Sequence, residues 1–235
     1  MAGVGIAAGA VAAVAGFGVG SLLTPFLVPS FGGKTAVALV AFPHAIATAI
    51  RLWRLRAAID WRILKTFGTA SAAGGLTGAW LFTEAAGSML AVVLGVLLLV
   101  VGGIQLAGLA VRLRIAPAWS AVAGAVSGFF GGLVGNQGGI RSAALLGFDL
   151  PARVFVATAG AIALIVDAVR LPVYLASHGH AILDAWRVVL VATIGVVAGT
   201  FAGTSILFRL SQRTFGRVIG ATLLALGAWL LWRAR

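Results

Sequence analysis

A short stretch in the second half of the chain combines residue types that can hold an anion: Gly135-Asn136-Gln137-Gly138-Gly139-Ile140-Arg141. The side-chain amides of Asn136 and Gln137 carry N–H donors, and Arg141 adds a fixed positive charge about one helical turn later. The glycines let backbone N–H groups come close to an oxyanion. We therefore predict that this stretch cradles a small anion. In the alternative interpretation the glycines only pack helices closely, and Arg141 reaches toward a membrane interface.

The first half of the chain carries a counterpart, in which Gly16-Phe17-Gly18-Val19-Gly20-Ser21 is followed by Thr24 and Pro25. This stretch offers hydroxyl groups and a backbone bent by glycine and proline, but no charge. We predict that Gly18, Gly20, Ser21 and Thr24 form the second part of the same site.

Two further groups of polar residues lie within apolar stretches. Thr48 and Arg51 follow His44 at four and seven residues, so the three share one helical face. Asp167 and Arg170 stand three apart and can pair on one face. A titratable residue inside a membrane segment is a functional hypothesis by default, so His44 and Asp167 are candidates for proton coupling or for lining the pathway. A packed histidine and a structural ion pair are the alternatives.

Other chemistry is poorly supported. The chain has no cysteine, which excludes thiol catalysis and thiolate metal ligands. His178 and His180 have no acidic residue beside them in a turn and make a poor metal site. The sequence lacks the Gly-x-Ser-x-Gly and Gly-x4-Gly-Lys-Ser/Thr motifs, and its five acids are dispersed. We expect no metal, no cofactor and no enzyme activity, although an intramembrane enzyme is a minor alternative.

The elements that must position these residues are membrane helices. The chain is 61% hydrophobic and only 9% charged, where a soluble domain has about 25% charged residues. Its apolar runs are long enough to cross a hydrocarbon core of about 30 Å. We predict an all-α polytopic membrane protein, one transport domain over residues 1–235, with about eight hydrophobic segments. The segments are residues 3–30, 34–53, 61–83, 86–110, 117–148, 151–176, 182–209 and 213–232.

The two halves of the chain resemble each other. Gly9 to Gly16 aligns with Gly124 to Gly131, and Arg54-Leu55 aligns with Arg170-Leu171. We therefore predict a repeat over about residues 1–115 and a second over about 116–235, each opening with a glycine-broken segment. Paired glycine-interrupted segments indicate the binding site of a secondary transporter, because a helix broken inside the membrane exposes backbone groups that a substrate can satisfy.

The orientation of the repeats depends on their first segments. If residues 3–30 and 117–148 turn back as re-entrant hairpins, the repeats are inverted; if they cross fully, the repeats are parallel. The distribution of Lys and Arg fits both models. Segment length favours hairpins, because about 30 residues around a central glycine cluster fit two half-helices better than one span.

The charge balance is strongly positive, with 17 Lys and Arg against five acids. The basic residues are scattered between apolar spans, so we expect no nucleic-acid binding. Part of the excess orients helices and contacts the lipid bilayer, and the remainder favours an anionic substrate. Most of the seven tryptophans fall near segment ends, where they would anchor helices at the interface.

On this layout, on the two glycine-rich stretches and on the short basic loops, the sequence resembles the sulfite exporter TauE/SafE family of bacterial membrane transporters. The first stretch departs from the family pattern, with Gly20-Ser21-Leu22 where a longer glycine run would stand. The resemblance implies export of sulfite, a sulfonate or a related sulfur-containing anion across the bacterial cytoplasmic membrane. An anion channel, a structural partner subunit or a transporter of another small anion are alternatives, and a homodimer is compatible with the sequence.

Overall fold

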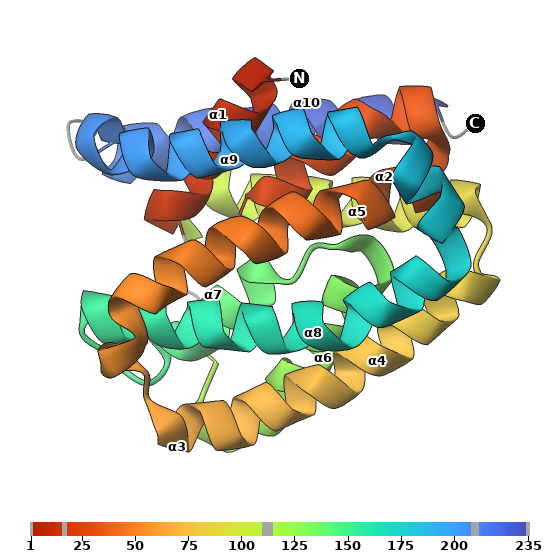
Figure 1. The fold of residues 1–235 in the computed structure, drawn as a ribbon. Coiled ribbons are helices and arrows are strands. Elements are labelled where there is room, and N and C mark those ends of the chain that lie inside the picture. Colours follow the sequence, from red (N-terminus) through yellow and green to blue (C-terminus); the bar gives the residue numbers. More distant parts are fainter. Residues whose placement is uncertain (1, 16–17, 110–114, 208–211, 234–235) are drawn as a thin grey trace.

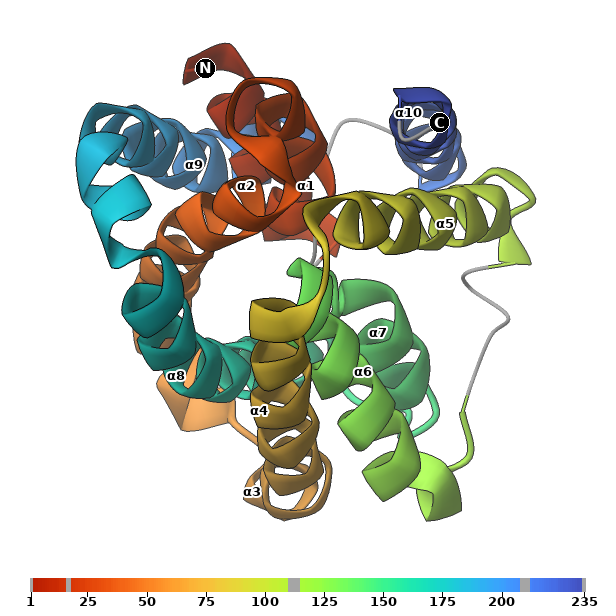
Figure 2. The ribbon, with the colours of Figure 1, turned by 90° about the vertical axis from the view of Figure 1, so that its right-hand side faces the viewer.

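The computed structural model describes residues 2–15, 18–109, 115–207 and 212–233. The regular elements in these ranges are helical, and they pack side by side as a bundle (Figures 1 and 2). By length and composition, four described stretches are suited to cross a membrane: Val19–Ala58, Gly87–Leu106, Pro117–Val134 and Arg153–Asp184. The predicted all-helical class is confirmed.

The first half of the chain forms helices α1 to α5. Asp60 caps the third of these, because its carboxylate accepts hydrogen bonds from the backbone N–H groups of Arg62 and Ile63. The main helices are α1 (Ala2–Ala15), α2 (Val19–Leu55), α3 (Trp61–Ile63), which continues through a π-helical stretch (Leu64–Gly68), α4 (Thr69–Glu84) and α5 (Gly87–Leu106).

The second half of the chain forms helices α6 to α10. A short 3₁₀ turn, Pro117–Trp119, leads into the first helix. The helices are α6 (Ser120–Val134), α7 (Gly138–Leu146), α8 (Ala152–Asp184), α9 (Trp186–Leu207) and α10 (Gln212–Arg233).

Both glycine-rich segments are broken, as the sequence predicts. Gly18 has a φ of 134° directly before α2 begins, and residues 16–17 of the same cluster lie outside the described residues. Gly135 ends α6 in the left-handed conformation, with a φ of 73°. An L side chain rarely adopts either value, so glycine is required at both positions.

The two longest helices are each broken where the sequence predicts a boundary between segments. We expected one segment to end at residue 30 and the next to begin at 34, and Gly32 between them has a φ of 76° and a ψ of 165°, so α2 consists of two helices joined by a kink. We expected a second boundary between residues 176 and 182, and His178 is non-helical there. Helical geometry resumes after His178 and reaches Asp184, so this connection is itself helical.

The α6–α7 pair forms a hairpin whose two ends lie together. The backbone N–H of Ile115, before α6, donates to the carbonyl of Ala143 in α7 at 3.1 Å. A Cβ on Gly147, just after α7, would overlap the carbonyl oxygen of Ile115. The chain therefore enters and leaves this element at the same end of the bundle.

The first broken segment has the same form. Gly5 of α1 packs against Ala192 of α9, and Ser30 near the end of the first part of α2 lines a cavity with Ala185 and Val188 at the start of α9. Both ends of this segment thus lie toward the start of α9.

Glycines let three helix pairs approach closely: α4 with α6, α1 with α9, and α5 with α10 (Figure 2). A Cβ on Gly128 of α6 would overlap the carbonyl oxygen of Ser71 in α4. A Cβ on Gly9 of α1 would overlap the carbonyl oxygen of Val196 in α9. A Cβ on Gly102 of α5 would lie 2.9 Å from the carbonyl oxygen of Gly220 in α10. Small residues at such contacts are typical of membrane helices.

Candidate functional site

The two helix breaks meet inside the bundle. The hydroxyl of Ser21, in the first turn of α2, donates to the side-chain oxygen of Asn136 at 3.3 Å. A Cβ on Gly20 would overlap the carbonyl oxygen of Gly135, so only glycine permits this approach. The contact joins the two predicted halves of the site, which lie 115 residues apart in the sequence.

Buried polar atoms without partners gather at this junction. Asn136 and Gln137 are 8% and 4% exposed, and within the described part of the chain no hydrogen bond reaches Nδ2 of Asn136 or Nε2 and Oε1 of Gln137. The same holds for the hydroxyl of Thr24, one turn further along α2. Buried polar groups almost always have a partner, so these atoms are suited to a polar ligand.

Backbone donors come from the N-terminus of α7. Gln137 stands at the N-cap position without a side-chain cap, and Gly138 and Gly139 begin the helix. The first N–H groups of a helix have no partner within it and carry positive potential. The hydroxyl of Ser127 donates to the carbonyl of Gln137 at 2.9 Å and holds this turn in place.

Positive charge exceeds negative charge around the junction. Arg141 is 1% exposed and interacts electrostatically with Arg51, Asp167 and Arg170. Among the described residues, three guanidinium groups and one carboxylate thus lie within electrostatic range of Arg141 or belong to it, and such an excess of positive charge attracts anions.

A chain of polar contacts runs from α2 through α8 to the second break. Nδ1 of His44 lies 2.7 Å from Oδ2 of Asp167, and Arg170 contacts Oδ1 of the same carboxylate through Nε at 2.9 Å and Nη2 at 2.7 Å. Nη1 of Arg170 donates to the carbonyl of Gly131 near the end of α6 at 2.6 Å. The Asp167–Arg170 pair follows from its spacing in the sequence; the contact with His44 was not predicted.

The other two residues of the predicted polar face are also placed inward. Thr48 is 3% exposed, and Nη1 of Arg51 donates to the carbonyl of Ala12 in α1 at 2.6 Å. Arg51 and Arg170 thus each bond to a carbonyl near the end of a half-helix, where the helix dipole is negative.

Sequence reasoning missed Tyr174. This side chain is fully buried, its hydroxyl donates to the carbonyl of Gly132, and its ring lies 4.4 Å from that of Phe82. Two signals mark it: it is the only tyrosine in the chain, and it follows Arg170 by four residues.

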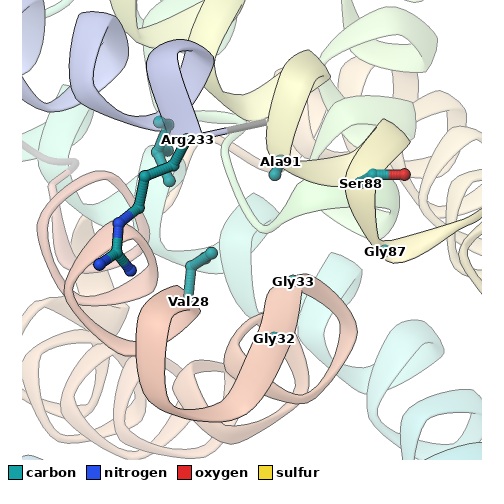
Figure 3. Close-up of a pocket in the computed structure, with 8 residues that line it drawn as sticks. Val28, Gly32, Gly33, Gly87, Ser88, Ala91 and Arg233 are labelled. Carbon is teal, nitrogen blue, oxygen red and sulfur yellow. The ribbon is translucent and has the colours of Figure 1, made fainter. Parts of the chain in front are cut away.

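Two cavities lie at the end of the bundle near Gly32. One, of about 360 Å³, lies between Gly32 and Gly33 of α2, Gly87 and Ser88 of α5, and Arg233 of α10 (Figure 3). The other, of about 540 Å³, has polar residues in its wall: Ser30, Thr35, Asp184 and Arg187. Neither wall includes the predicted binding residues.

Potential metal ligands do not gather in the described ranges, where no three His, Asp or Glu side chains lie close enough to hold an ion. What the structure shows at the junction of the two broken helices is a group of buried polar and charged side chains.

The family model described as "Sulfite exporter TauE/SafE" matches residues 1–234. The chain belongs to this family. The TauE/SafE family comprises transporters, not enzymes, and membership implies a multi-pass membrane protein that transports sulfur-containing anions. Comparison with curated proteins and with solved structures finds no match.

Proposed function

We propose that this TauE/SafE protein is a secondary transporter that exports sulfite or a small organosulfonate across a bacterial cytoplasmic membrane. Asn136, Gln137 and the backbone N–H groups of Gly138 and Gly139 bind the oxyanion. Arg141 supplies positive charge, and α2 adds the hydroxyls of Ser21 and Thr24 next to Gly18 and Gly20.

The observation that carries the proposal is the set of unpartnered buried amides at the junction of the two breaks. Leaving a buried donor unsatisfied costs about 1–3 kcal/mol. A sulfonate or sulfite group presents several acceptor oxygens close together, so one ligand can satisfy the donors from both breaks.

The charge of the cluster supports the same class of substrate. An uncompensated positive site inside a membrane is unfavourable until an anion occupies it. The membrane potential favours exit of net negative charge from the cytoplasm by about 2.3 kcal/mol per charge per 100 mV, so export needs no nucleotide hydrolysis where the transported species carries net negative charge, as a dianion does even with one proton.

The packing supports alternating access between two inverted repeats, about residues 1–115 and 116–235. Helix α1 opens the first repeat and packs on α9 of the second, while α6 opens the second repeat and packs on α4 of the first. The last helices of the repeats, α5 and α10, pack on each other. The hairpin form of α6–α7 fits an element that enters and leaves the membrane on the same side. Each repeat then has three full crossings, so the second repeat starts on the opposite side from the first and is inverted relative to it.

The test is transport by purified protein in proteoliposomes. We expect saturable uptake and counterflow of one of four labelled compounds: the anions sulfite, sulfoacetate and sulfate, or taurine, a sulfonate whose amino group makes it a zwitterion at neutral pH. Asn136→Ala and Arg141→Ala should each lower kcat/KM at least about 10-fold, because a hydrogen bond to a charged group contributes about 1.5–3 kcal/mol. Gln105→Ala is the matched control, since it removes an amide near the end of α5, outside the cluster.

Three outcomes would contradict the proposal. If folded, reconstituted protein transports none of the four compounds, sulfite and organosulfonates are excluded as its substrates. Unsaturable flux without counterflow indicates a channel. Equal kinetics for Asn136→Ala and Gln105→Ala place the site elsewhere.

A further inference from the structure

The chain of contacts from His44 to the second break places a titratable group in line with the candidate anion site. His44 is 12% exposed, whereas Asp167 and Arg170 are 1% and 2% exposed. Arg170 continues this series of contacts by donating to the carbonyl of Gly131. Gly131 in turn packs against Gln137, since a Cβ on Gly131 would lie 3.1 Å from the Cβ of Gln137. Few groups separate the imidazole from the amide that we assign to the anion.

The contacts fix which nitrogen of His44 can take a proton. Asp167 is paired with Arg170, which keeps its carboxylate charged, and a charged carboxylate only accepts hydrogen bonds. Nδ1 of His44, at 2.7 Å from Oδ2 of Asp167, therefore carries the hydrogen. Nε2 is then the basic nitrogen, and a proton taken there from water makes an imidazolium with no change in oxidation state.

The charged groups around His44 determine how this proton responds to an anion. On helix α8, Asp167 contacts His44, Arg170 pairs with Asp167, and Tyr174 lies beside Arg170. Arg141 of α7 and Arg51 of α2 belong to the same cluster. In the described part of the chain, four other helices pack on α2. Helices α1 and α5 contain no titratable side chain. The only titratable residue of α9 is Arg187, and those of α10 are Arg213, Arg217 and Arg233.

We propose that His44 is a proton-binding site coupled to the anion site, and that a proton and the anion cross the membrane together in the same direction. An imidazolium would add to the positive charge of Arg51, Arg141 and Arg170, and an anion at Gln137 offsets that repulsion. Each ligand therefore raises the affinity for the other by the same factor. After the carrier reorients, loss of the anion returns the proton from Nε2 to water. The inference rests on the proposed function.

Arg170 transmits the coupling. A proton on His44 places a second cation on the carboxylate of Asp167, so His44, Asp167 and Arg170 together carry one net positive charge instead of none. The guanidinium of Arg170, bonded to the carbonyl of Gly131 and 3.3 Å from the position of a Cβ on Gly135, brings this charge to the second break. It is a positioning residue for the anion site.

The test follows protons and anion in the same proteoliposomes. With wild-type protein and a sulfoacetate gradient, a pH dye in the lumen should report proton movement in the direction of the anion. Both acidic groups of sulfoacetate are ionised near neutral pH, so the anion itself brings no proton. Equal K⁺ on both sides with valinomycin holds the potential near zero, so that anion entry does not draw protons through the lipid. The apparent KM should be about 10-fold lower at pH 6 than at pH 8, within the usual range of coupling between two ligands.

His44→Gln separates coupling from transport. Glutamine keeps a donor for Asp167 but cannot take the proton. We expect exchange of labelled sulfoacetate to continue, with proton movement reduced at least about 5-fold and a KM that changes less than about 2-fold between pH 6 and 8. His180→Gln, which removes an exposed histidine of α8, should behave as wild type.

Failure of this inference is distinguishable from failure of the proposed function. No anion exchange by wild-type protein contradicts the proposed function. Exchange without proton movement, or unchanged proton movement in His44→Gln, overturns the coupling. Loss of exchange in His44→Gln protein with a wild-type unfolding temperature also overturns it, because His44 would then belong to the anion site. If sulfite alone is exchanged, the comparison with His44→Gln still holds, since protons carried by sulfite are common to both proteins.

Discussion

At the scale of single residues, the buried pair of Asp167 and Arg170 connects the helices around the candidate site. Arg170 bonds to the carboxylate within its own helix and to the carbonyl of Gly131 in α6. Both side chains are almost fully buried, so each charge depends on the other for compensation. The carboxylate also receives His44 from α2, and one acidic residue therefore holds three helices in register.

The pair makes a prediction about stability. Arg170→Gln should destabilise the protein by about 3–5 kcal/mol, because it leaves the charge of Asp167 buried without its main partner. Adding Asp167→Asn should recover a large part of this loss, since the uncompensated charge is then removed. Thermal unfolding in detergent measures both variants. Additive losses in the double variant would show that the two residues act independently.

At the scale of elements, close backbone contact between helices is built from glycines. Gly128 of α6 faces the carbonyl of Ser71 in α4 without room for a methyl group. Gly103 of α5 has open space around the position of a Cβ. These two helical glycines thus have different reasons to be present, which the sequence alone does not distinguish.

Alanine substitutions separate these two cases. Gly128→Ala should destabilise the protein by about 1–3 kcal/mol, because α4 and α6 must move apart to accommodate the methyl group. Gly103→Ala should be neutral or stabilise α5 by up to about 1 kcal/mol, since alanine is the better helix former. Unfolding temperatures of the two variants, measured side by side, test the contact. A Gly128→Ala protein as stable as wild type would contradict it.

At the scale of the whole molecule, the membrane topology depends on whether residues 117–148 cross the bilayer or turn back within it. Residues before α6 and after α7 lie together through the contact of Ile115 with Ala143. The turn between α8 and α9 lies at the opposite end of α8. Full crossing of residues 117–148 would instead place the two ends of that segment on opposite sides of the membrane.

Labelling of single cysteines tests this topology, and the chain has no cysteine of its own to remove. Ala118→Cys, Pro151→Cys and Leu183→Cys all lie at exposed positions. A membrane-impermeant maleimide applied to intact cells should label either both Ala118→Cys and Pro151→Cys or neither of them. Leu183→Cys should give the opposite result, because it lies on the other side of the membrane. Opposite labelling of Ala118→Cys and Pro151→Cys would exclude the inverted arrangement.

The tryptophans show how far local sequence determines the exterior. Six of them are more than half exposed, near helix ends as the sequence predicts, where aromatic rings anchor a protein at the membrane interface. They are Trp53, Trp61, Trp80, Trp119, Trp186 and Trp232.

The sequence by itself determined the features that depend on neighbouring residues. Apolar run length predicts the membrane helices, glycine clusters predict the breaks at Gly18 and Gly135, and a spacing of three residues predicts the Asp167–Arg170 pair. These features follow from helix geometry and from backbone sterics, which act over a few residues. The kink at Gly32, which separates the two helices of α2, lies between two predicted segments and follows from the same local rules.

Only the tertiary structure decided which of these residues meet. Ser21 contacts Asn136 across 115 residues of chain, and His44 contacts Asp167 across 123. Such contacts depend on which helix faces pack together, and that is set by glycine contacts between α4 and α6 and between α1 and α9. The sequence predicts two glycine-rich stretches and several titratable residues as candidates, and packing brings them together in one buried cluster.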